Sequence, residues 1–547
     1  MQPKQLLAQL NFRLFGYTEG ANFGYIKNQS FPLIKVDWKF PLNCISGSYT
    51  PETDCFMFLN RAESANTVLW GGVPDEPLWN YQLHYFEWLF SEFQYSDQYL
   101  GRSQYFIQSW CTSFGQGEFS LEPYPTSRRL VSWVKYYIQN KMLPECNVLN
   151  AMIGQSQFLS KNIENHITGN HLISNYKAMI FVGIYFHMSE MGRGFFNLGI
   201  TGLIRELKIQ VLEDGCHFEL SPMYHCMVLV DLIETHSLME LSLDKISEFF
   251  SDLEEFSFLI QQKIDQMISY ITNLTAGITR IPFINDSCER QVLPLSDSMF
   301  LTASRVGDGR SDQKDDMFTP LSGLWRVSRG SFTIIFNVSK FGPDSVNGHS
   351  HADTLSFELW FGGRELFVNG GVSTYHDLRA RKFERSSAFS NGLTFNGESS
   401  SEIWGKFRSG RMHSNPEAVA IKSKSEISLS GYIRIALGNG GFANWFRNIS
   451  LQSGLISVTD QVVGTFSSIK FRLRVHPEVK VISSDGSSVY LESTGAVFKV
   501  TWENYIVKLR KSYYSPEFGK RVSTHVLEFY GRSCGRYNVV VEAVSNG

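Results

Sequence analysis

Apolar side chains recur at three- and four-residue steps through the first part of the chain, the spacing typical of amphipathic helices. The clearest stretch, residues 77–93, reads Pro-Leu-Trp-Asn-Tyr-Gln-Leu-His-Tyr-Phe-Glu-Trp-Leu-Phe-Ser-Glu-Phe. The same spacing predicts helices over residues 127–139, 148–164, 171–190, 198–212, 223–241 and 256–274. Short connections between so many helices indicate a helical array rather than a single bundle.

The pattern changes to short alternating runs in the second part of the chain. Residues 304–319 are polar and rich in Gly and Asp, as in a linker or exposed loop. Alternating runs separated by Gly, Asn, Ser and Asp follow at 332–338, 355–361, 456–463, 489–493 and 538–544. We therefore predict an α+β multidomain protein, with a helical domain over residues 1–305 and an antiparallel β-sandwich over 306–547.

Composition narrows the class of protein. The 547 residues are 43% hydrophobic and 19% charged, as in ordinary globular proteins, and carry a net charge of −3. That balance gives no basic field for nucleic acid. Aromatic residues are frequent, at 14%, and indicate large aromatic cores, a cleft whose rings stack on sugars, or both.

Two further features bear on the compartment of the protein. The eight cysteines form no CxxC pair, which argues against a zinc ribbon or a disulfide scaffold. The first ten residues lack the basic and apolar regions of a signal peptide, so we expect a cytoplasmic location, or a periplasmic one if the chain has been trimmed. No run approaches the roughly 20 apolar residues of a transmembrane helix.

The segment Asn-Gly-His-Ser-His-Ala-Asp at 347–353 is the strongest candidate for chemistry. It places His349, His351 and Asp353 at every second position, just before an alternating run. In an extended strand these side chains would share one face and point into one site. The structural alternative is a polar ladder between strands.

Two more clusters lie on predicted helix starts. Asn170 and His171 are placed where an amide and an imidazole suit an anionic group, although Asn170 can equally cap the helix. The segment 213–225, Glu-Asp-Gly-Cys-His-Phe-Glu-Leu-Ser-Pro-Met-Tyr-His, leads into a helix whose first turn holds Tyr224. A buried tyrosine with a satisfied hydroxyl is the ordinary alternative there.

A fourth cluster runs from 384 to 408. It contains Arg385 and Arg408, which suit the binding of carboxylates or sulfates, or equally an ion pair of the protein itself.

Taken in order, these motifs resemble the heparinase II/III-like and alginate lyase superfamily. The matching segments are Asn-His-Leu at 170–172, Asp-Gly-Cys-His-Phe-Glu-Leu-Ser-Pro-Met-Tyr-His at 214–225, and Gly-His-Ser-His-Ala-Asp-Thr-Leu-Ser-Phe-Glu at 348–358. Residues 78–86 and 123–129 are also similar, and 399–408 resembles the subgroup found with bacterial surface-polysaccharide genes. The resemblance implies an incomplete (α/α) toroid followed by an antiparallel β-sandwich, and cleavage of uronic-acid polysaccharides by β-elimination.

The resemblance also implies roles for individual residues. Asn170, with His171, would hold the uronate carboxylate, while Tyr224 and His349 would remove the C5 proton and protonate the leaving O4. We favour Tyr224 as the acid, or as both the acid and the base. The remaining candidates for substrate contact are His217, Glu219, Arg385, Trp404 and Arg408.

The resemblance disfavours a metal here. Some relatives bind a structural metal through the second histidine of the His-x-His pair, an aspartate on the next strand and a later histidine. His351 matches the first ligand, but Asn369 and Ser390 stand at the other two positions. Because two of three ligands are replaced, we expect no cofactor and no tight zinc site, with His351 a weak candidate.

Three functions follow from these observations. The first is a lyase acting on an acidic polysaccharide, linked to bacterial surface or exopolysaccharide metabolism. The second is a glycan-binding or assembly factor with weak or no turnover. The third is a hydrolase using paired carboxylates such as Glu219 and Glu402, whose spacing gives it little support.

Overall fold

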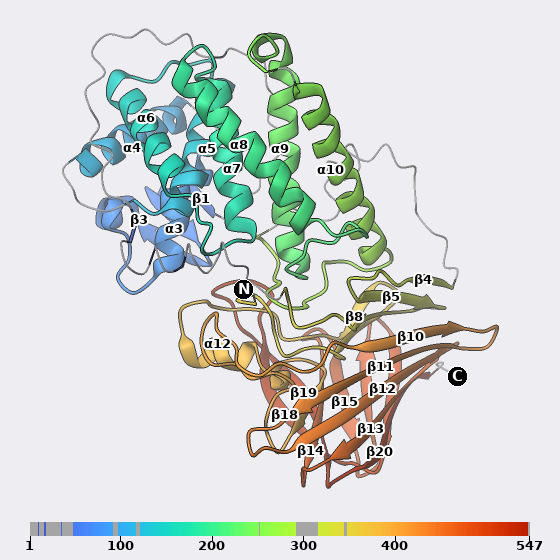
Figure 1. The fold of residues 1–547 in the computed structure, drawn as a ribbon. Coiled ribbons are helices and arrows are strands. Elements are labelled where there is room, and N and C mark those ends of the chain that lie inside the picture. The colour runs from blue at the N-terminus through green and yellow to red at the C-terminus, as the bar shows by residue number, and fades with distance from the viewer. Residues whose placement is uncertain are drawn as a thin grey trace. The chain divides into compact units, whose positions relative to one another are not determined.

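The structure is a computed structural model (Figure 1). It describes residues 9, 12, 16, 17, 34, 47–90, 97–115, 121–250, 252–291, 315–343 and 347–544. These residues form two compact units. One is helical and runs to Gly215, with Cys226–Ile268 added. The other contains the strands from Asp316 onward and takes in two earlier segments, Cys216–His225 and Ser269–Glu289. The predicted boundary at 305/306 lies outside the described residues.

The helical unit confirms the predicted helices, except that the stretch predicted over 77–93 is divided: its α-helix ends at Tyr85, Phe86 has a left-handed φ of 60°, and a 3-10 turn follows. Its described α-helices are α2 (Ala65–Val68), α3 (Pro77–Tyr85), α4 (Asp97–Gly115), α5 (Pro123–Gln139), α6 (Cys146–Lys161), α7 (Asn170–Tyr185), α8 (Glu190–Gln210), α9 (Pro222–Ile246) and α10 (Leu253–Thr275), with 3-10 turns η1 (Leu69–Gly71) and η2 (Glu87–Phe90). The first turn of α9 and the last turns of α10 belong to the other unit. Helix α4 and a small sheet, β1 (Gly47–Thr50), β2 (Cys55–Phe58) and β3 (Arg61–Ser64), were not predicted.

Glycines set the close packing of α7 against α8. A Cβ at Gly183 would come within 2.5 Å of the Phe196 nitrogen, and one at Gly199 within 2.7 Å of the Ile180 nitrogen. Real Cβ atoms do not approach backbone this closely, so the two helices lie side by side because these positions lack a side chain. The pair is visible in the helical unit in Figure 1.

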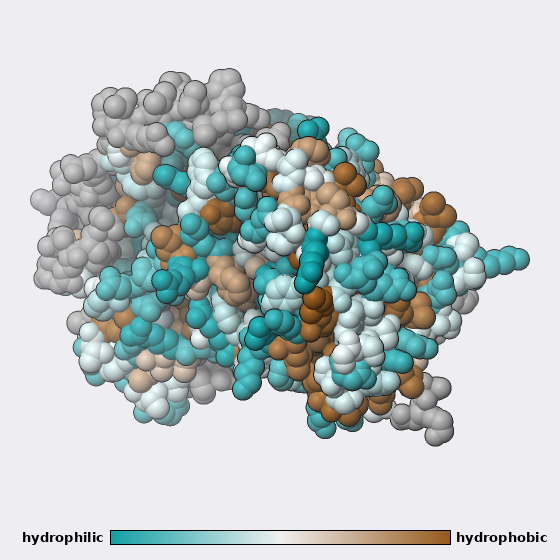
Figure 2. All heavy atoms as spheres, turned by 90° about the horizontal axis from the view of Figure 1, so that it is seen from below, coloured by the Kyte–Doolittle hydropathy of each residue, from teal (hydrophilic) through white to brown (hydrophobic). Residues whose placement is uncertain are grey.

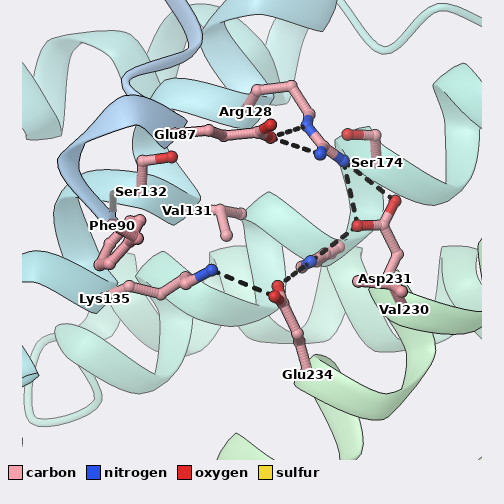
Figure 3. Close-up of a pocket in the computed structure, with 11 residues that line it drawn as sticks. Glu87, Phe90, Arg128, Val131, Ser132, Lys135, Ser174, Val230, Asp231 and Glu234 are labelled. Atoms are coloured by element: carbon pink, nitrogen blue, oxygen red, sulfur yellow. Dashed lines mark hydrogen bonds and ion pairs between the residues drawn. The ribbon is translucent and has the colours of Figure 1, made fainter. Parts of the chain in front are cut away.

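A chain of buried charges crosses the helical unit (Figure 3). Three cations and three anions line a cavity of about 20 Å³ that is bounded by η2, α5, α7 and α9. They are Glu87, Arg128, Lys135, Lys177, Asp231 and Glu234. Arg128 bridges Glu87 and Asp231, Lys177 bridges Asp231 and Glu234, and Lys135 completes the chain on Glu234. The charges balance, which offsets the high cost of burying them.

The strand unit is antiparallel throughout its named strands. Its eight-stranded sheet has the order β10 (Glu417–Lys422), β11 (Ile427–Ala436), β12 (Phe442–Gln452), β13 (Leu455–Gly464), β20 (Gly535–Val544), β17 (Ala496–Glu503), β16 (Ser488–Ser493), β15 (Lys480–Ser484). A four-stranded sheet has the order β18 (Ile506–Tyr514), β19 (Val522–Gly531), β14 (Ile469–Arg474), β9 (Leu393–Phe395). A five-stranded sheet has the order β4 (Asp316–Phe318), β5 (Leu324–Arg329), β6 (Phe332–Asn337), β7 (Phe357–Phe361), β8 (Arg364–Phe367).

Alternation along the strands fills the core between these sheets. Along β11 and β13 buried residues alternate with less buried ones, as a strand with one packed face requires. One hydrophobic cluster joins residues of all three sheets, including Phe336, Trp445 and Leu527. On the face drawn in Figure 2, hydrophobic residues are interspersed with hydrophilic ones. No helix among the described residues is long and apolar enough to cross a membrane.

One ion pair lies inside this apolar core. Arg447 and Asp460 are both buried and form two hydrogen bonds of 2.8 Å. Arg447 also donates to the carbonyls of Leu355 and Asn391, so it connects β12 to segments distant in the sequence.

Candidate active site

Tyr224 and His349 lie face to face within the strand unit. Their ring centroids are 4.0 Å apart and the rings are tilted by 37°. Tyr224 lies in the first turn of α9, where its backbone N–H donates to the Ser221 hydroxyl. The side chain of His349 is 15% exposed, so solvent or a substrate can reach the ring.

The segment that carries His349 is not a strand, so the prediction that His349, His351 and Asp353 share one face of a strand is wrong. Residues 348–355 form turns, and the next strand, β7, begins only at Phe357. The segment is held by Asn285 and Asp286 instead. The Asp286 N–H donates to the His349 carbonyl, and the His351 N–H donates to the Asn285 side-chain oxygen.

Asp286 is the centre of the polar network behind His349. Its buried carboxylate is 2.8 Å from His349 Nδ1 and 2.6 Å from His351 Nε2. Arg381 donates to both of its oxygens. Burial alone would raise the pKa of Asp286, but Arg381 and the two imidazoles hold it well below the ordinary value. Because an ionised carboxylate only accepts, His349 Nδ1 carries a hydrogen, so the lone pair that a base needs lies on Nε2.

Tyr375 is a third member of the site that the sequence did not suggest. Its hydroxyl is 3.1 Å from the Tyr224 hydroxyl, and the Arg381 guanidinium lies 4.6 Å from its ring centroid. Burial, with Asp286 nearby, raises the pKa of Tyr375 well above the ordinary value, so it is a neutral donor at neutral pH. Tyr375, Asp286 and Arg381 come from three separate segments and stand in no recognisable spacing with His349.

Asp353 points elsewhere. Its carboxylate accepts from the Asn285 N–H at 2.8 Å and from the Asn337 amide at 3.0 Å. Burial raises the pKa of Asp353 to about 7. It therefore fixes the fold of the turn segment rather than joining the Tyr224–His349 pair.

Asn170 and His171 belong to the helical unit. The N-cap of α7 is Gly169, at φ 66°, so Asn170 is the first residue of the helix and not its cap. The His171 ring stacks on Tyr124 at 4.2 Å, and its Nδ1 is 3.2 Å from the Glu164 carboxylate. Their approach to the Tyr224–His349 pair stays a prediction.

The predicted substrate contacts divide into buried and exposed residues. His217 and Glu219 are 0% and 1% exposed, and burial holds the pKa of His217 well below its ordinary value, so that its ring is neutral. Arg385 is fully buried and donates to carbonyls of the chain, including those of Asn347 and Ser350. We therefore assign Arg385 a structural role rather than the expected carboxylate clamp. Trp404 and Arg408 are exposed.

The residues at the two positions where some relatives carry metal ligands form hydrogen bonds within the protein. The Asn369 amide donates to the Phe283 carbonyl and its oxygen accepts from the Asn391 N–H. The Ser390 hydroxyl is 3.3 Å from the Ser387 carbonyl. Among the described residues no group of three His, Cys, Asp or Glu side chains is arranged to hold a metal ion. The cation beside His351 is Arg381, which would repel a second one.

Two family models match the chain. Heparinase II/III N-terminus matches residues 131–301, and Heparinase II/III-like, C-terminal, matches residues 312–541. A heparin-sulfate lyase of Bacteroides stercoris is 24% identical over 260 residues, which are 43% of this chain and 38% of that protein. One of Bacteroides thetaiotaomicron is 26% identical over 241 residues, 38% of this chain and 33% of that protein. The matches thus span well under half of these relatives.

Solved structures agree at the level of the fold. The crystal structure of a heparinase III has a TM-score of 0.70 at 17% identity, with 100% of this chain and 92% of that chain covered. A heparan sulfate lyase of Pedobacter heparinus has a TM-score of 0.57 at 14% identity, with 99% and 88% covered. These likenesses confirm the predicted fold class, a helical toroid followed by an antiparallel β-sandwich.

Proposed function

The chain belongs to the heparinase II/III-like family, and from this premise we propose that it is a polysaccharide lyase that cleaves a uronic-acid-containing glycan by β-elimination. The observation that carries the proposal is the pairing of Tyr224 with His349, backed by Asp286 and Tyr375. A substrate drawn from a bacterial surface polymer or exopolysaccharide is part of the proposal.

The chemistry of such a reaction suits these groups. The C5 proton of a uronate is weakly acidic, so a positioned base must remove it while the neighbouring carboxylate is neutralised. His349 Nε2 takes the proton from C5, the C4–C5 double bond forms, and the C4–O4 bond breaks. Tyr224 donates its hydroxyl proton to the departing O4 and keeps its 3.1 Å contact with the Tyr375 hydroxyl. The proton held by His349 then passes to Tyr224 through solvent, which restores both groups. Asn170 and His171 are assigned to the carboxylate on the resemblance alone.

We propose that this reaction needs no metal. Arg381 supplies the positive charge beside Asp286 and His351, and the residues at 369 and 390 are an amide and a hydroxyl. Extended dialysis against a chelator should leave the rate unchanged. A loss of rate that zinc restores would contradict this part of the proposal.

The test of the reaction is a panel of uronate polymers followed by ultraviolet absorbance, since elimination creates an unsaturated uronate. Wild-type protein should generate the chromophore with at least one polymer, and Tyr224→Phe and His349→Ala should abolish it. Mass spectrometry separates elimination from hydrolysis, because hydrolysis adds one water to the products.

The second candidate is a glycan-binding or assembly factor without turnover. Asn369 and Ser390, where relatives carry metal ligands, are the observation that favours it. Binding of an acidic glycan that survives both substitutions, with no chromophore from wild type, would establish it in place of the lyase.

A further inference from the structure

A short hairpin lies beside the Tyr224–His349 pair and is built more firmly than an ordinary surface loop. In it Ile403 and Ser409 form an antiparallel bridge. The N–H groups of Trp404 and Gly405 both donate to the Arg408 carbonyl, at 3.1 and 3.2 Å. We call residues 403–409 the platform hairpin.

Two buried arginines fix the platform hairpin from below. Arg381 on α12 (Leu378–Glu384) and Arg385 at its C-cap are four residues apart, so they lie on one face of that helix. Arg381 Nε donates to the Lys406 carbonyl at 3.0 Å, and Arg385 Nη1 donates to the Gly405 and Lys406 carbonyls at 3.1 and 3.2 Å.

The same two arginines also hold the turn segment that carries His349. Arg381 donates to the Gly348 carbonyl at 3.3 Å, and Arg385 donates to the Ser350 carbonyl at 2.9 Å. Both guanidinium groups are 0% exposed. The hairpin and the catalytic turn therefore move together, because displacing either would leave buried donors without acceptors.

The side chains of the platform hairpin are exposed although its backbone is fixed. Phe407 is 44% exposed, and its ring centroid lies 6.0 Å from that of His349 and 5.3 Å from that of Tyr375. Trp404 is 61% exposed, Arg408 is exposed and Lys406 is partly exposed. The hairpin whose Phe407 lies beside the catalytic rings thus also carries an exposed indole and two cations.

Trp404 is held in one orientation despite its exposure. A Cβ at Gly410 would come within 2.5 Å of the indole nitrogen, so the ring lies directly over the backbone of that glycine. The indole N–H bonds to the Glu402 carboxylate, which also pairs with Arg411 at 3.5 Å. The indole thus has a fixed edge and one covered face, and its other face is open to solvent. Binding a ligand on that face would cost little side-chain entropy, because the ring is already held in place.

We propose that the platform hairpin is a second sugar-binding site, which takes an anionic sugar of the polymer next to the one that is cleaved. The sugar stacks its C–H face on Trp404, and its sulfate or carboxylate pairs with Arg408 and Lys406. Indole faces suit the apolar faces of pyranoses, and guanidinium forks suit sulfate and carboxylate. The proposal rests on the proposed function, since it assigns a neighbouring subsite of the same reaction.

The test uses uronate oligomers of increasing length on full-length protein. Trp404→Ala and Arg408→Ala should each raise KM about three- to tenfold for long oligomers, with kcat little changed. KM for the shortest oligomer that wild type cleaves should not change, because that oligomer does not reach the hairpin. Gly410→Ala, which displaces the indole without altering it, should behave like Trp404→Ala.

Matched controls are Ile421→Ala, which removes an equally exposed side chain on β10 (61% exposed), and Arg364→Ala, which removes an exposed cation on β8. Both should leave KM unchanged at every length. If Trp404→Ala and Arg408→Ala also leave KM unchanged for long oligomers while wild type is active, the second site is refuted and the lyase stands.

If wild type gives no chromophore, the lyase is refuted and the hairpin is tested by retardation of the protein in gels that contain the same polymers. Weaker retardation of both variants than of wild type would retain the binding site. Equal retardation, or none for wild type, would overturn it.

Discussion

Replacing Asp286 by Asn tests whether this carboxylate sets the protonation of His349. Four donors end on Asp286, one from each of two imidazoles and two from Arg381. An asparagine keeps the shape but brings one N–H₂ group among those donors. Where the N–H₂ group replaces Oδ2, the oxygen that faces His349, the ring must move its hydrogen from Nδ1 to Nε2 and would then face the substrate with a donor in place of a lone pair.

Two magnitudes follow from this geometry. Loss of a positioned base lowers a rate about 10²- to 10⁴-fold, so kcat should fall within that range. Arg381 would also lose its main counter-charge while 0% exposed, and breaking a buried pair costs about 3–5 kcal/mol of unfolding free energy. Chromophore formation per folded molecule measures the first effect, denaturant unfolding the second, and ¹⁵N spectra of the imidazoles the change of tautomer.

The matched control is Asp353→Asn, a buried carboxylate on the same turn segment that bonds to Asn285 and Asn337. It should keep kcat within a few-fold of wild type. If Asp286→Asn folds and retains both the wild-type rate and the Nδ1-protonated tautomer, the reasoning about His349 is refuted.

Three further predictions concern stability. The pKa of Asp353 is about 7 in the folded state and 3.8 in the unfolded state, so the folded state holds an extra proton between these pH values. The free energy of unfolding should therefore fall as pH rises through this range, by up to about 1.4 kcal/mol per pH unit. Urea unfolding of Asp353→Asn should lack this pH dependence, and an unchanged slope would contradict the argument. Arg447→Met leaves the Asp460 carboxylate buried without its ion-pair partner and should lower the free energy of unfolding by about 3–5 kcal/mol in the same assay. A loss below about 1 kcal/mol would show that Asp460 does not need Arg447 to stay buried. Gly199→Ala should destabilise the helical unit by about 1–3 kcal/mol, whereas Gly194→Ala on the same helix, with nothing within 4 Å, should not; equal effects would disprove the close-packing argument.

The parts of the fold that follow from local periodicity could be predicted from the sequence. Helices such as α7 and α10 and strands such as β13 depend on which face of one segment is apolar, and this is visible in the order of residues. Helix α4 was not predicted because polar residues interrupt the spacing of its apolar positions, for example at Arg102–Gln104.

The candidate site was predictable only in part. Tyr224 and His349 were singled out because their motifs contain many polar and ionisable side chains. In the structure their rings are in contact although the two residues are 125 positions apart in the sequence. Asp286, Tyr375 and Arg381 were missed because a single aspartate, tyrosine or arginine has no signature until folding places it beside its partner. The turn segment at 348–355 was mistaken for a strand because its polar residues alternate, as they would in a strand. The sequence does not show that Asn285 and Asp286, rather than a neighbouring strand, bind this segment.

The charge chain in the helical unit limits how this protein can evolve. Each of its six members neutralises a neighbour in a cavity with room for roughly one or two water molecules. A single neutral substitution at Arg128, Lys177 or Asp231 would leave the chain of charges with one uncompensated charge. Substitutions at these positions should therefore occur in compensating pairs. Related proteins should keep all six charged residues or replace them together with apolar ones.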